Sequence, residues 1–415
     1  MIISFLFFLV FLIYLTFNTK RAIICAYPLC LLFTTLPLVS VGKIHIGLSF
    51  SIFIVIIIVS LYKSYRYINK NPLLTPIKLI VCGYLLSWLF GAERSSIYPL
   101  TSAIVTTIIP LFIFPFIERK QDVYCFIKCM CLVLLASVLY ALVEFSLGKN
   151  VWMYWLQSQT SATIFHDHID NIRFGYGRCN SFFDFPIPFG DVCAIFFSFL
   201  LFYKYSYIEL KINGRYIIIL MGLMLVGLIL SNSRAPVMAF FVGILHYPMF
   251  RNTKKFLFAV LFVITIIIIA HNSIFLIVDS LFGDNYADVS GSSSSMRINQ
   301  FAICLDQFLK YPYFGGGLNR MEYLQGALKG EGLYGGESIL FILMVNQGLV
   351  GIIPYFLAFF YMVKVFKKEQ RRFPLFLSLA WLTASLASLT TGVTIAFPMV
   401  LLLVVYRSYR LGMIK

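Results

Sequence analysis

Long apolar runs separated by short polar turns make up most of this 415-residue chain. A helix needs about 20 apolar residues to cross the hydrocarbon core of a bilayer, and runs near that length recur from end to end. They cover about residues 2–17, 22–41, 47–62, 77–91, 97–117, 123–147, 186–203, 216–230, 235–250, 256–278, 338–363 and 373–406. The last run is too long for one crossing, and Thr390, Thr391 and Gly392 divide it into two short spans. The pattern predicts an all-α polytopic membrane protein with about 12–13 transmembrane helices, and it leaves open whether the first run crosses the membrane.

Two long polar loops interrupt the apolar runs, at residues 148–185 and 279–336. The second loop contains an amphipathic segment whose apolar residues recur at helical spacing: Ile298, Phe301, Leu305, Phe308 and Leu309. Ser294 and Ser295 can cap the start of this helix, and Pro312 ends it. Glycines 315–317 follow, and we expect them to form a flexible hinge. A solvated connector would also explain the loop, but so apolar a chain has few reasons to keep it, so we interpret it as half of an active site.

Composition agrees with a membrane protein. Hydrophobic residues make up 60% of the chain, charged residues 12%, and the mean hydropathy is +0.89. The apolar runs do not alternate with polar residues as the strands of a membrane β-barrel do. No repeat array or soluble domain interrupts the pattern. We therefore expect residues 1–415 to form one membrane domain with two elaborated loops.

The net charge of +16 follows from topology. With both long loops placed outside, 23 of the 33 basic residues lie inside and 10 outside, whereas about 4 of the 17 acidic residues lie inside and 13 outside. This distribution satisfies the positive-inside rule, with the N-terminus outside and the C-terminus inside. The charge therefore gives no reason to expect a nucleic acid partner.

Arg234 is the most informative single residue. It lies in the sequence SNSRAP at residues 231–236, a break between two apolar runs on the outer side. A charge near the centre of the membrane costs about 2.5–3.5 kcal/mol, and less near the interface. An arginine that extends its side chain to lipid phosphate is the alternative explanation. Because a neutral residue would serve a plain turn better, we favour a functional role for Arg234.

Other outer-face arginines also lie near points where the chain re-enters the membrane. Arg297 begins the amphipathic segment, and Arg178 precedes the run that starts at Pro186. Arginine binds phosphate through a planar fork of donors, so this set suits an anionic ligand such as a diphosphate. Arg173 in the first loop, and Arg320 and Glu322 in the second, complete the candidate substrate-binding residues.

Glu337 lies where the chain re-enters the membrane after the second loop. A carboxylate drawn out of water has a raised pKa and can then act as a general base. The alternative is a glutamate that stabilises a helix N-terminus through the helix dipole, by about 0.3–1 kcal/mol. Both roles are compatible.

Cysteine and histidine spacing gives no metal motif. His166 and His168 are two positions apart, do not share a helix face and have no third histidine nearby. Seven of the nine cysteines lie in or beside apolar runs, where they act as small hydrophobic residues. Cys179 and Cys304 lie in or near the two loops, so a disulfide between them stays possible. We expect neither a metal nor another cofactor.

The chain resembles the bacterial O-antigen polymerases and the related O-antigen ligases. The resemblance covers nearly the whole chain in topology, since these families have about a dozen spans and two large periplasmic loops. Three specific features are similar: the polar turn that carries Arg234, the arginine-bearing second loop with Arg297, and the polar position at Glu337. Ligases typically carry a histidine at this last position, so Glu337 favours a polymerase.

This resemblance implies a metal-independent membrane glycosyltransferase of the GT-C type in the bacterial inner membrane, with its active site facing the periplasm. It would join O-antigen repeat units carried on undecaprenyl diphosphate, for lipopolysaccharide biosynthesis. Arg234 and Arg297 would stabilise the leaving diphosphate, Glu337 would act on the acceptor hydroxyl, and Arg178 would guide the substrate. Membrane lipids and a chain-length regulator protein are the other expected partners. The alternatives are a ligase that transfers the polysaccharide to lipid A-core, or a flippase for lipid-linked oligosaccharides.

Overall fold

The computed structural model describes residues 2–32, 36–41, 44–159, 172–173, 176–209, 211–247, 294–328, 338–366, 370–387 and 393–414. Helices account for most of these residues, and the only strands in the described ranges form two short antiparallel pairs. The chain is therefore an all-α membrane protein. The predicted span at residues 256–278 lies outside the described ranges.

The elements follow the apolar runs closely. The helices of the first half are α1 (Ile2–Phe17), α2 (Thr19–Leu32), α3 (Leu48–Ile68), α4 (Leu74–Phe90), α5 (Ile97–Ile113), a 3₁₀ turn (Phe114–Phe116), α6 (Lys120–Leu147), α7 (Val151–Gln159), α8 (Pro186–Ser206), α9 (Gly214–Leu230) and α10 (Arg234–Ile244). Those of the second half are α13 (Ser294–Lys310), α14 (Arg320–Ala327), α15 (Ile339–Ile342), a π-helix (Leu343–Gln347), α16 (Leu349–Lys364), α17 (Arg372–Ala387) and α18 (Val393–Arg410). The strands are β1 (Pro37–Val41), β2 (Ile44–Gly47), β3 (Ile172–Arg173) and β4 (Tyr176–Gly177).

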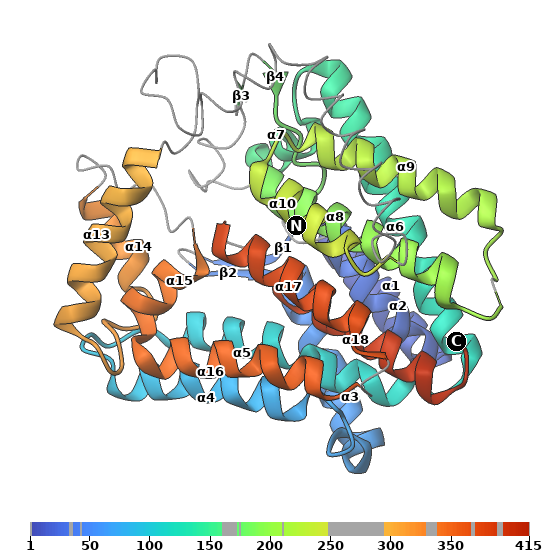
Figure 1. Ribbon diagram of the computed structural model, residues 1–415, viewed down its shortest axis with the longest axis horizontal. Helices are drawn as coiled ribbons and strands as arrows, with labels where there is room; N and C mark the ends of the chain where they lie inside the picture. The colour runs from blue at the N-terminus through green and yellow to red at the C-terminus, as the bar shows by residue number, and fades with distance from the viewer. Residues whose placement is uncertain are drawn as a thin grey trace, which may run out of the picture.

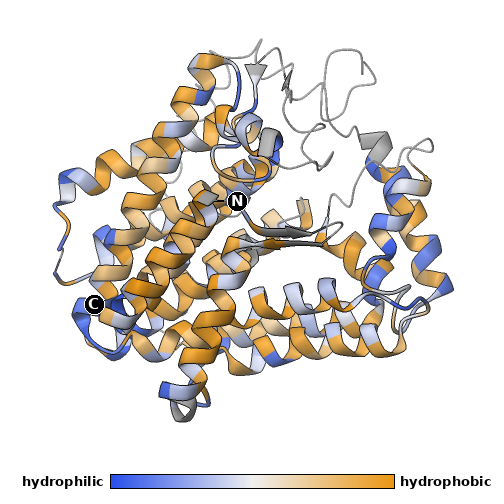
Figure 2. Cartoon of the chain, turned by 180° about the vertical axis from the view of Figure 1, so that it is seen from behind, coloured by the Kyte–Doolittle hydropathy of each residue, from blue (hydrophilic) through white to orange (hydrophobic). Residues whose placement is uncertain are grey.

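Among the described residues, three helices are both long and apolar enough to cross a membrane: Ile97–Phe116, Lys120–Leu147 and Pro186–Ser206. Several shorter apolar helices accompany them, including α9, α10, α16 and α17. Apolar residues cover these helices, whereas polar residues gather on α13, α14 and the turns between helices (Figure 2). The last long apolar run divides as expected, because α17 ends at Ala387 and α18 begins at Val393.

Helix α8 is the centre of the bundle. Its residues 188–203 are all buried, and α9, α10, α17 and α18 contact it. A second group of helices, in which α16 packs against α4, α4 against α5 and α5 against α3, forms the layer along the bottom of Figure 1. Burial of a large apolar side chain from water stabilises a fold by about 1.5–3 kcal/mol, but in lipid helices associate mainly through close packing.

Antiparallel pairing of α10 and α17 determines which residues meet at each end of the bundle. Arg372, at the start of α17, donates a hydrogen bond to the carbonyl of Leu245, just past the end of α10 (3.0 Å). Further along, Gly243 lies beside Ala380, and Ala239 packs in one cluster with Ala380 and Ala384. The start of α10 is therefore level with the end of α17 near Ala387.

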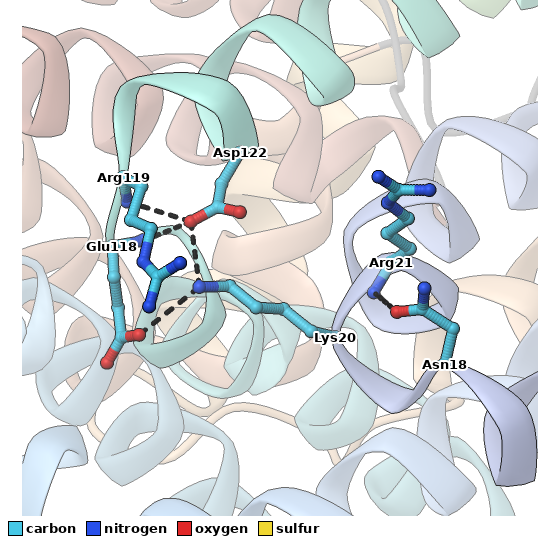
Figure 3. A network of polar contacts seen from close by, with 6 residues as sticks. All are labelled: Asn18, Lys20, Arg21, Glu118, Arg119 and Asp122. Carbon is cyan, nitrogen blue, oxygen red and sulfur yellow. Dashed lines mark hydrogen bonds and ion pairs between the residues drawn. The ribbon is translucent and has the colours of Figure 1, made fainter.

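The opposite end of the bundle holds a network of charges (Figure 3). Lys20, in the first turn of α2, forms ion pairs with Glu118 (3.2 Å) and Asp122 (2.8 Å). Asp122 also accepts hydrogen bonds from the backbone of Glu118 and Arg119, which caps the start of α6. The basic turns that the charge count places inside, at residues 20–21 and 119–120, thus lie together.

The predicted span at residues 22–41 is wrong in its second half. Helix α2 ends at Leu32, and β1 begins at Pro37 and pairs with β2, with Val41 opposite Ile44. Pro37 cannot continue a helix, and the β-branched residues Val39 and Val41 favour an extended chain. Apolar content alone did not distinguish this hairpin from a helix.

The predicted span at residues 338–363 is interrupted. Helix α15 passes into the π-helix, and Gly348 then breaks the chain with a φ of 61° before α16 begins. Glycine adopts this left-handed conformation without a steric penalty. Leu349, Val350 and Gly351 thus form the first turn of α16, and the break precedes them.

Glycines 315–317 form a packed junction, which corrects the expectation of a flexible hinge. All three are buried, and the N–H groups of Gly316 and Gly317 donate to the carbonyls of Val345 and Asn346 in the π-helix. A Cβ atom on Gly315 would lie 2.4 Å from the Asn346 backbone. The glycines are required because two backbones meet here without room for a side chain.

The amphipathic segment forms helix α13, which ends two residues before Pro312. Three residues of its apolar stripe face outward in the structure, since Ile298 and Leu309 are 67% and 68% exposed and Phe301 is 43% exposed, whereas Leu305 and Phe308 are half-buried. The face that packs against the π-helix and α15 instead contains Gln300 and Cys304, both fully buried.

Candidate functional site

The first part of the candidate site is a short segment, Asn180 and Ser181, that hydrogen bonds attach to the end of α6. Glu144, in the last turn of α6, accepts hydrogen bonds from the N–H groups of Asn180 (3.0 Å) and Ser181 (2.8 Å). Ser181 has a φ of 55°, and its hydroxyl donates to the carbonyl of Ser137 (2.7 Å). Asn150 donates to the carbonyl of Ser181 (2.9 Å). Four hydrogen bonds therefore anchor this segment to α6 and the turn after it.

Arg178 precedes this segment and reaches the turn between α9 and α10. Its Nη2 donates to the hydroxyl of Ser233 (2.7 Å), and the backbone N–H of Cys179 donates to the carbonyl of Leu230 (3.0 Å). The structure thus brings Arg178 beside the turn that carries Arg234, because Ser233 immediately precedes Arg234.

Arg234 is the first residue of α10 and is half-buried. The hydroxyl of Ser233, at the N-cap position, donates to the carbonyl of Ser231 (2.8 Å) and makes no capping hydrogen bond to α10. The N-terminus of a helix favours an anion, because its first N–H groups and its dipole are directed outward. A basic residue there is unfavourable unless an anion is present. The turn therefore has the geometry and the charge to bind a phosphate group.

Arg297 lies at this same end of the bundle. Its Nη2 is 3.4 Å from the carbonyl oxygen of Ala387, the last residue of α17. Since the end of α17 is level with the start of α10, the exposed Arg297 comes from α13 to the end where Arg234 and Arg178 lie. The contact with Ala387 also has a structural benefit, because a cation stabilises the C-terminus of a helix.

Arg320 and Glu322 lie on α14, which is distant in sequence from the turn between α9 and α10. The guanidinium of Arg320 forms an ion pair with Glu93, donates to Gln307 (3.3 Å) and lies over the ring of Tyr323. These contacts fasten α14 to the loop after α4 and to α13. Glu322 is exposed on α14. Substrate binding by either residue stays a prediction.

Two other candidates fall outside this description. Glu337 lies outside the described residues, and Arg173 is described only as part of β3. The residue after Glu337 is Ser338, whose hydroxyl accepts a hydrogen bond from the N–H of Leu340 and caps α15 (3.2 Å). Helix α15 contacts both α13 and α17, so the chain that follows Glu337 packs against the helices that bring Arg297 to the site.

Sequence reasoning missed the acidic residues near the first loop. Glu144 is an acid inside an apolar run, and this position was the available signal, because such residues rarely lie in membrane helices without a role. Asp184 precedes α8, and burial raises the pKa of its carboxyl to about 6. Asp191, in α8, is only 2% exposed.

Within the described ranges, no three His, Cys, Asp or Glu side chains form a group that could hold a metal ion. His166 and His168 lie outside these ranges. All nine cysteines are free thiols, so Cys179 and Cys304 are not joined by a disulfide.

Comparison with known proteins gives one match. Residues 219–356 match a family model described as O-Antigen ligase. No curated protein and no solved structure matches the chain. The matched region contains Arg234, Arg297 and Glu337, whereas Glu144 and Arg178 precede it.

Proposed function

Because residues 219–356 match a family model described as O-Antigen ligase, and the chain resembles the O-antigen polymerases in its topology, we propose that it is an O-antigen polymerase. It would be a membrane glycosyltransferase that joins repeat units carried on undecaprenyl diphosphate. The reaction would occur at the periplasmic face of the bacterial inner membrane.

The observation that carries this proposal is the set of arginines at one end of the bundle. Arg178 bonds to Ser233 beside Arg234, at the N-terminus of α10, and Arg297 reaches the neighbouring end of α17. Guanidinium groups and helix N–H groups bind phosphate oxygens through charge-assisted hydrogen bonds. A diphosphate leaving group is the part of the proposed donor that needs such stabilisation.

The proposed reaction proceeds by displacement at the first sugar of the growing chain. A hydroxyl oxygen of the incoming unit attacks the anomeric carbon, and the bond between that carbon and the diphosphate oxygen breaks. The electron pair of this bond goes to undecaprenyl diphosphate, whose charge Arg234 and Arg297 would stabilise. Glu337 would accept the hydroxyl proton. This chemistry uses no nucleotide sugar.

The second candidate is an O-antigen ligase, which the description of the matched family favours. A ligase would use the same arginines on the same leaving group and differ in the acceptor. Ligases typically carry a histidine at the position of Glu337, and this difference from the ligases favours the polymerase.

Reconstitution separates these functions. Purified protein in liposomes would receive undecaprenyl-diphosphate-linked repeat units, with and without lipid A-core. A ladder of chain lengths without lipid A-core is the result expected for a polymerase. Transfer only onto lipid A-core would identify a ligase, and movement of the units across the bilayer without new bonds would identify a flippase. Either of these last two results would refute the proposal.

A further inference from the structure

We propose that Glu144 is a positioning residue, which holds the backbone that carries Arg178 so that this arginine lies on Ser233 beside Arg234. The inference rests on the proposed function, because it concerns how the diphosphate site is kept ready. Glu144 is not in the region that the family model matches, and it would not touch the substrate.

The geometry of the Glu144 carboxylate is the first observation. Glu144 is 6% exposed, and each of its two oxygens accepts one backbone N–H, from Asn180 and from Ser181. A buried carboxylate is costly unless its oxygens are hydrogen-bonded. A carboxylate gives each of these two consecutive N–H groups an oxygen of its own. A glutamine has one acceptor oxygen, and its NH₂ group would face the second N–H.

The backbone that Glu144 holds is the second observation. Ser181 adopts a left-handed conformation, with a φ of 55°, that residues other than glycine rarely adopt. Such a conformation persists only where the surroundings fix it. Here Glu144 binds its N–H, Asn150 its carbonyl and Ser137 its hydroxyl. The conformation is thus imposed by α6 and the turn after it.

The position of Arg178 is the third observation. Only Cys179 separates it from the anchored segment, and the N–H of Cys179 is itself bonded to Leu230. On the other side, the Arg178 guanidinium is bonded to Ser233, next in sequence to Arg234. Two guanidinium groups on adjoining segments repel each other, so some contact must hold Arg178 in place before an anion arrives. The anchor at Glu144 supplies that contact through the backbone.

Loss of the anchor therefore has a specific expected effect. In Glu144→Gln, the segment loosens and Arg178 no longer lies ready at Ser233. A displacement of about 1 Å in a positioned group can lower a rate by about 10²-fold, so we expect kcat/KM for chain extension to fall by roughly 10- to 100-fold. Glu118→Gln is the matched control, because Glu118 lies in the ion-pair network at the opposite end of the bundle.

A double-mutant cycle tests whether Glu144 acts through Arg178. We expect Arg178→Ala alone and the Glu144→Gln/Arg178→Ala double variant to have equal kcat/KM, because an anchor has no effect once the anchored group is gone. If the two losses multiply, Glu144 does not act through Arg178.

Ser233→Ala provides a second test of the same contact, since it removes the hydroxyl that binds Arg178 and leaves the anchor at Glu144 intact. It should behave like Arg178→Ala, with Ser146→Ala on the surface of α6 as its control.

Hydrogen exchange gives a result that does not depend on activity. In Glu144→Gln, a peptide that covers residues 179–183 should exchange its amide protons faster, while peptides from the middle of α6 exchange as in the wild type. Unchanged exchange at residues 179–183 would overturn the inference, whatever the enzyme does. A wild-type protein that forms no ladder would instead refute the proposed function and leave the exchange result valid.

Discussion

At the scale of single residues, the hydroxyl of Ser233 links the two parts of the site. It accepts a hydrogen bond from Arg178 and donates one to Ser231, so it does not cap α10. The Ser233 side chain therefore makes no capping hydrogen bond to the first N–H groups of α10, and the proposed phosphate site uses this helix N-terminus. A planar guanidinium can form two parallel hydrogen bonds to a phosphate, whereas a lysine provides a point charge on a flexible stem.

Arg234→Ala should therefore abolish chain extension while the protein still accumulates in the membrane. Arg234→Lys should restore little activity, because an ammonium group cannot reproduce bidentate contacts. The same pair of variants at Arg297 should give the same result. The measurement is ladder formation on lipid-linked units, with protein amount determined by immunoblot.

The control for these variants is Arg94→Ala, because Arg94 is an exposed arginine in the loop after α4. It should extend chains like the wild type. Full activity in both lysine variants would mean that the two positive charges only anchor the protein to lipid.

Glu337→Gln tests the general base at the same scale. A glutamine is nearly isosteric but accepts no proton, so turnover should fall by about 10²–10⁴-fold while substrate still binds. Glu337→Asp, which moves the carboxylate back by one methylene, should be intermediate. Extension rates at several pH values provide the measurement. If Glu337 only stabilises a helix N-terminus, the glutamine variant would lose no more than about 1 kcal/mol of stability and would keep its rate.

At the scale of elements, the π-helix organises the second half of the site. Its residue Asn346 accepts a hydrogen bond from the N–H of Met321 (2.7 Å) and donates one to the carbonyl of Leu318 (2.7 Å). Its carbonyl also accepts a hydrogen bond from Ser87 on α4 (2.7 Å). A π-helix inserts one extra residue per turn, which turns side chains to new directions, and such segments are frequent at functional sites. This one joins α14 to α4 and contacts α13, the helix that carries Arg297.

Gly315→Ala should disrupt that junction. The new Cβ would lie 2.4 Å from the Asn346 backbone, and Gly315 has a φ of 72° that an alanine adopts only with strain. We expect a loss of about 1–3 kcal/mol in stability, seen as a lower thermal midpoint of the purified protein in detergent. Gly326→Ala is the control, since nothing lies within 4 Å of the added carbon in α14, and alanine favours a helix. Equal midpoints for the two variants would contradict the packed junction.

At the scale of the whole molecule, the helices alternate in direction so that two sets of turns separate. Arg178, Ser233 and Ala387 lie at one end, whereas Lys20, Asp122 and Leu245 lie at the other. The charge count assigns the first set to the outside and the second to the inside. A site at the outer end could receive lipid-linked substrates from that leaflet.

Cysteine labelling in a cysteine-free background should follow this division. A membrane-impermeant thiol reagent added to spheroplasts should label Gly326→Cys and Lys149→Cys, and should reach Lys70→Cys and Arg119→Cys only after lysis. The same rule predicts labelling from outside at Asn171 and only after lysis at Lys254 and Lys368, which lie outside the described residues. Labelling of Lys70→Cys in intact spheroplasts would invert the orientation and place the arginines on the inner side.

The sequence by itself determined the membrane class and most helix boundaries, and it supplied the candidate arginines. A run of about 20 apolar residues can satisfy its backbone in lipid only as a helix, so length and hydropathy suffice for most of the spans. They do not suffice for the hairpin after Leu32 or for the break at Gly348. Local chemistry also suffices for the break before Arg234 and for the end of α13 before Pro312. These features depend on neighbours in sequence.

Tertiary structure alone decided what those elements bring together. Arg178 meets Ser233 across 55 positions, and Glu144 holds Ser181 across 37. Neither contact leaves a periodic pattern in the chain, because each depends on how α6, α8, α9 and α10 pack. The same holds for the packed glycines at 315–317 and for the outward apolar face of α13. Local propensity specifies an element, but its neighbours in space decide which of its faces is buried and which of its polar groups find partners.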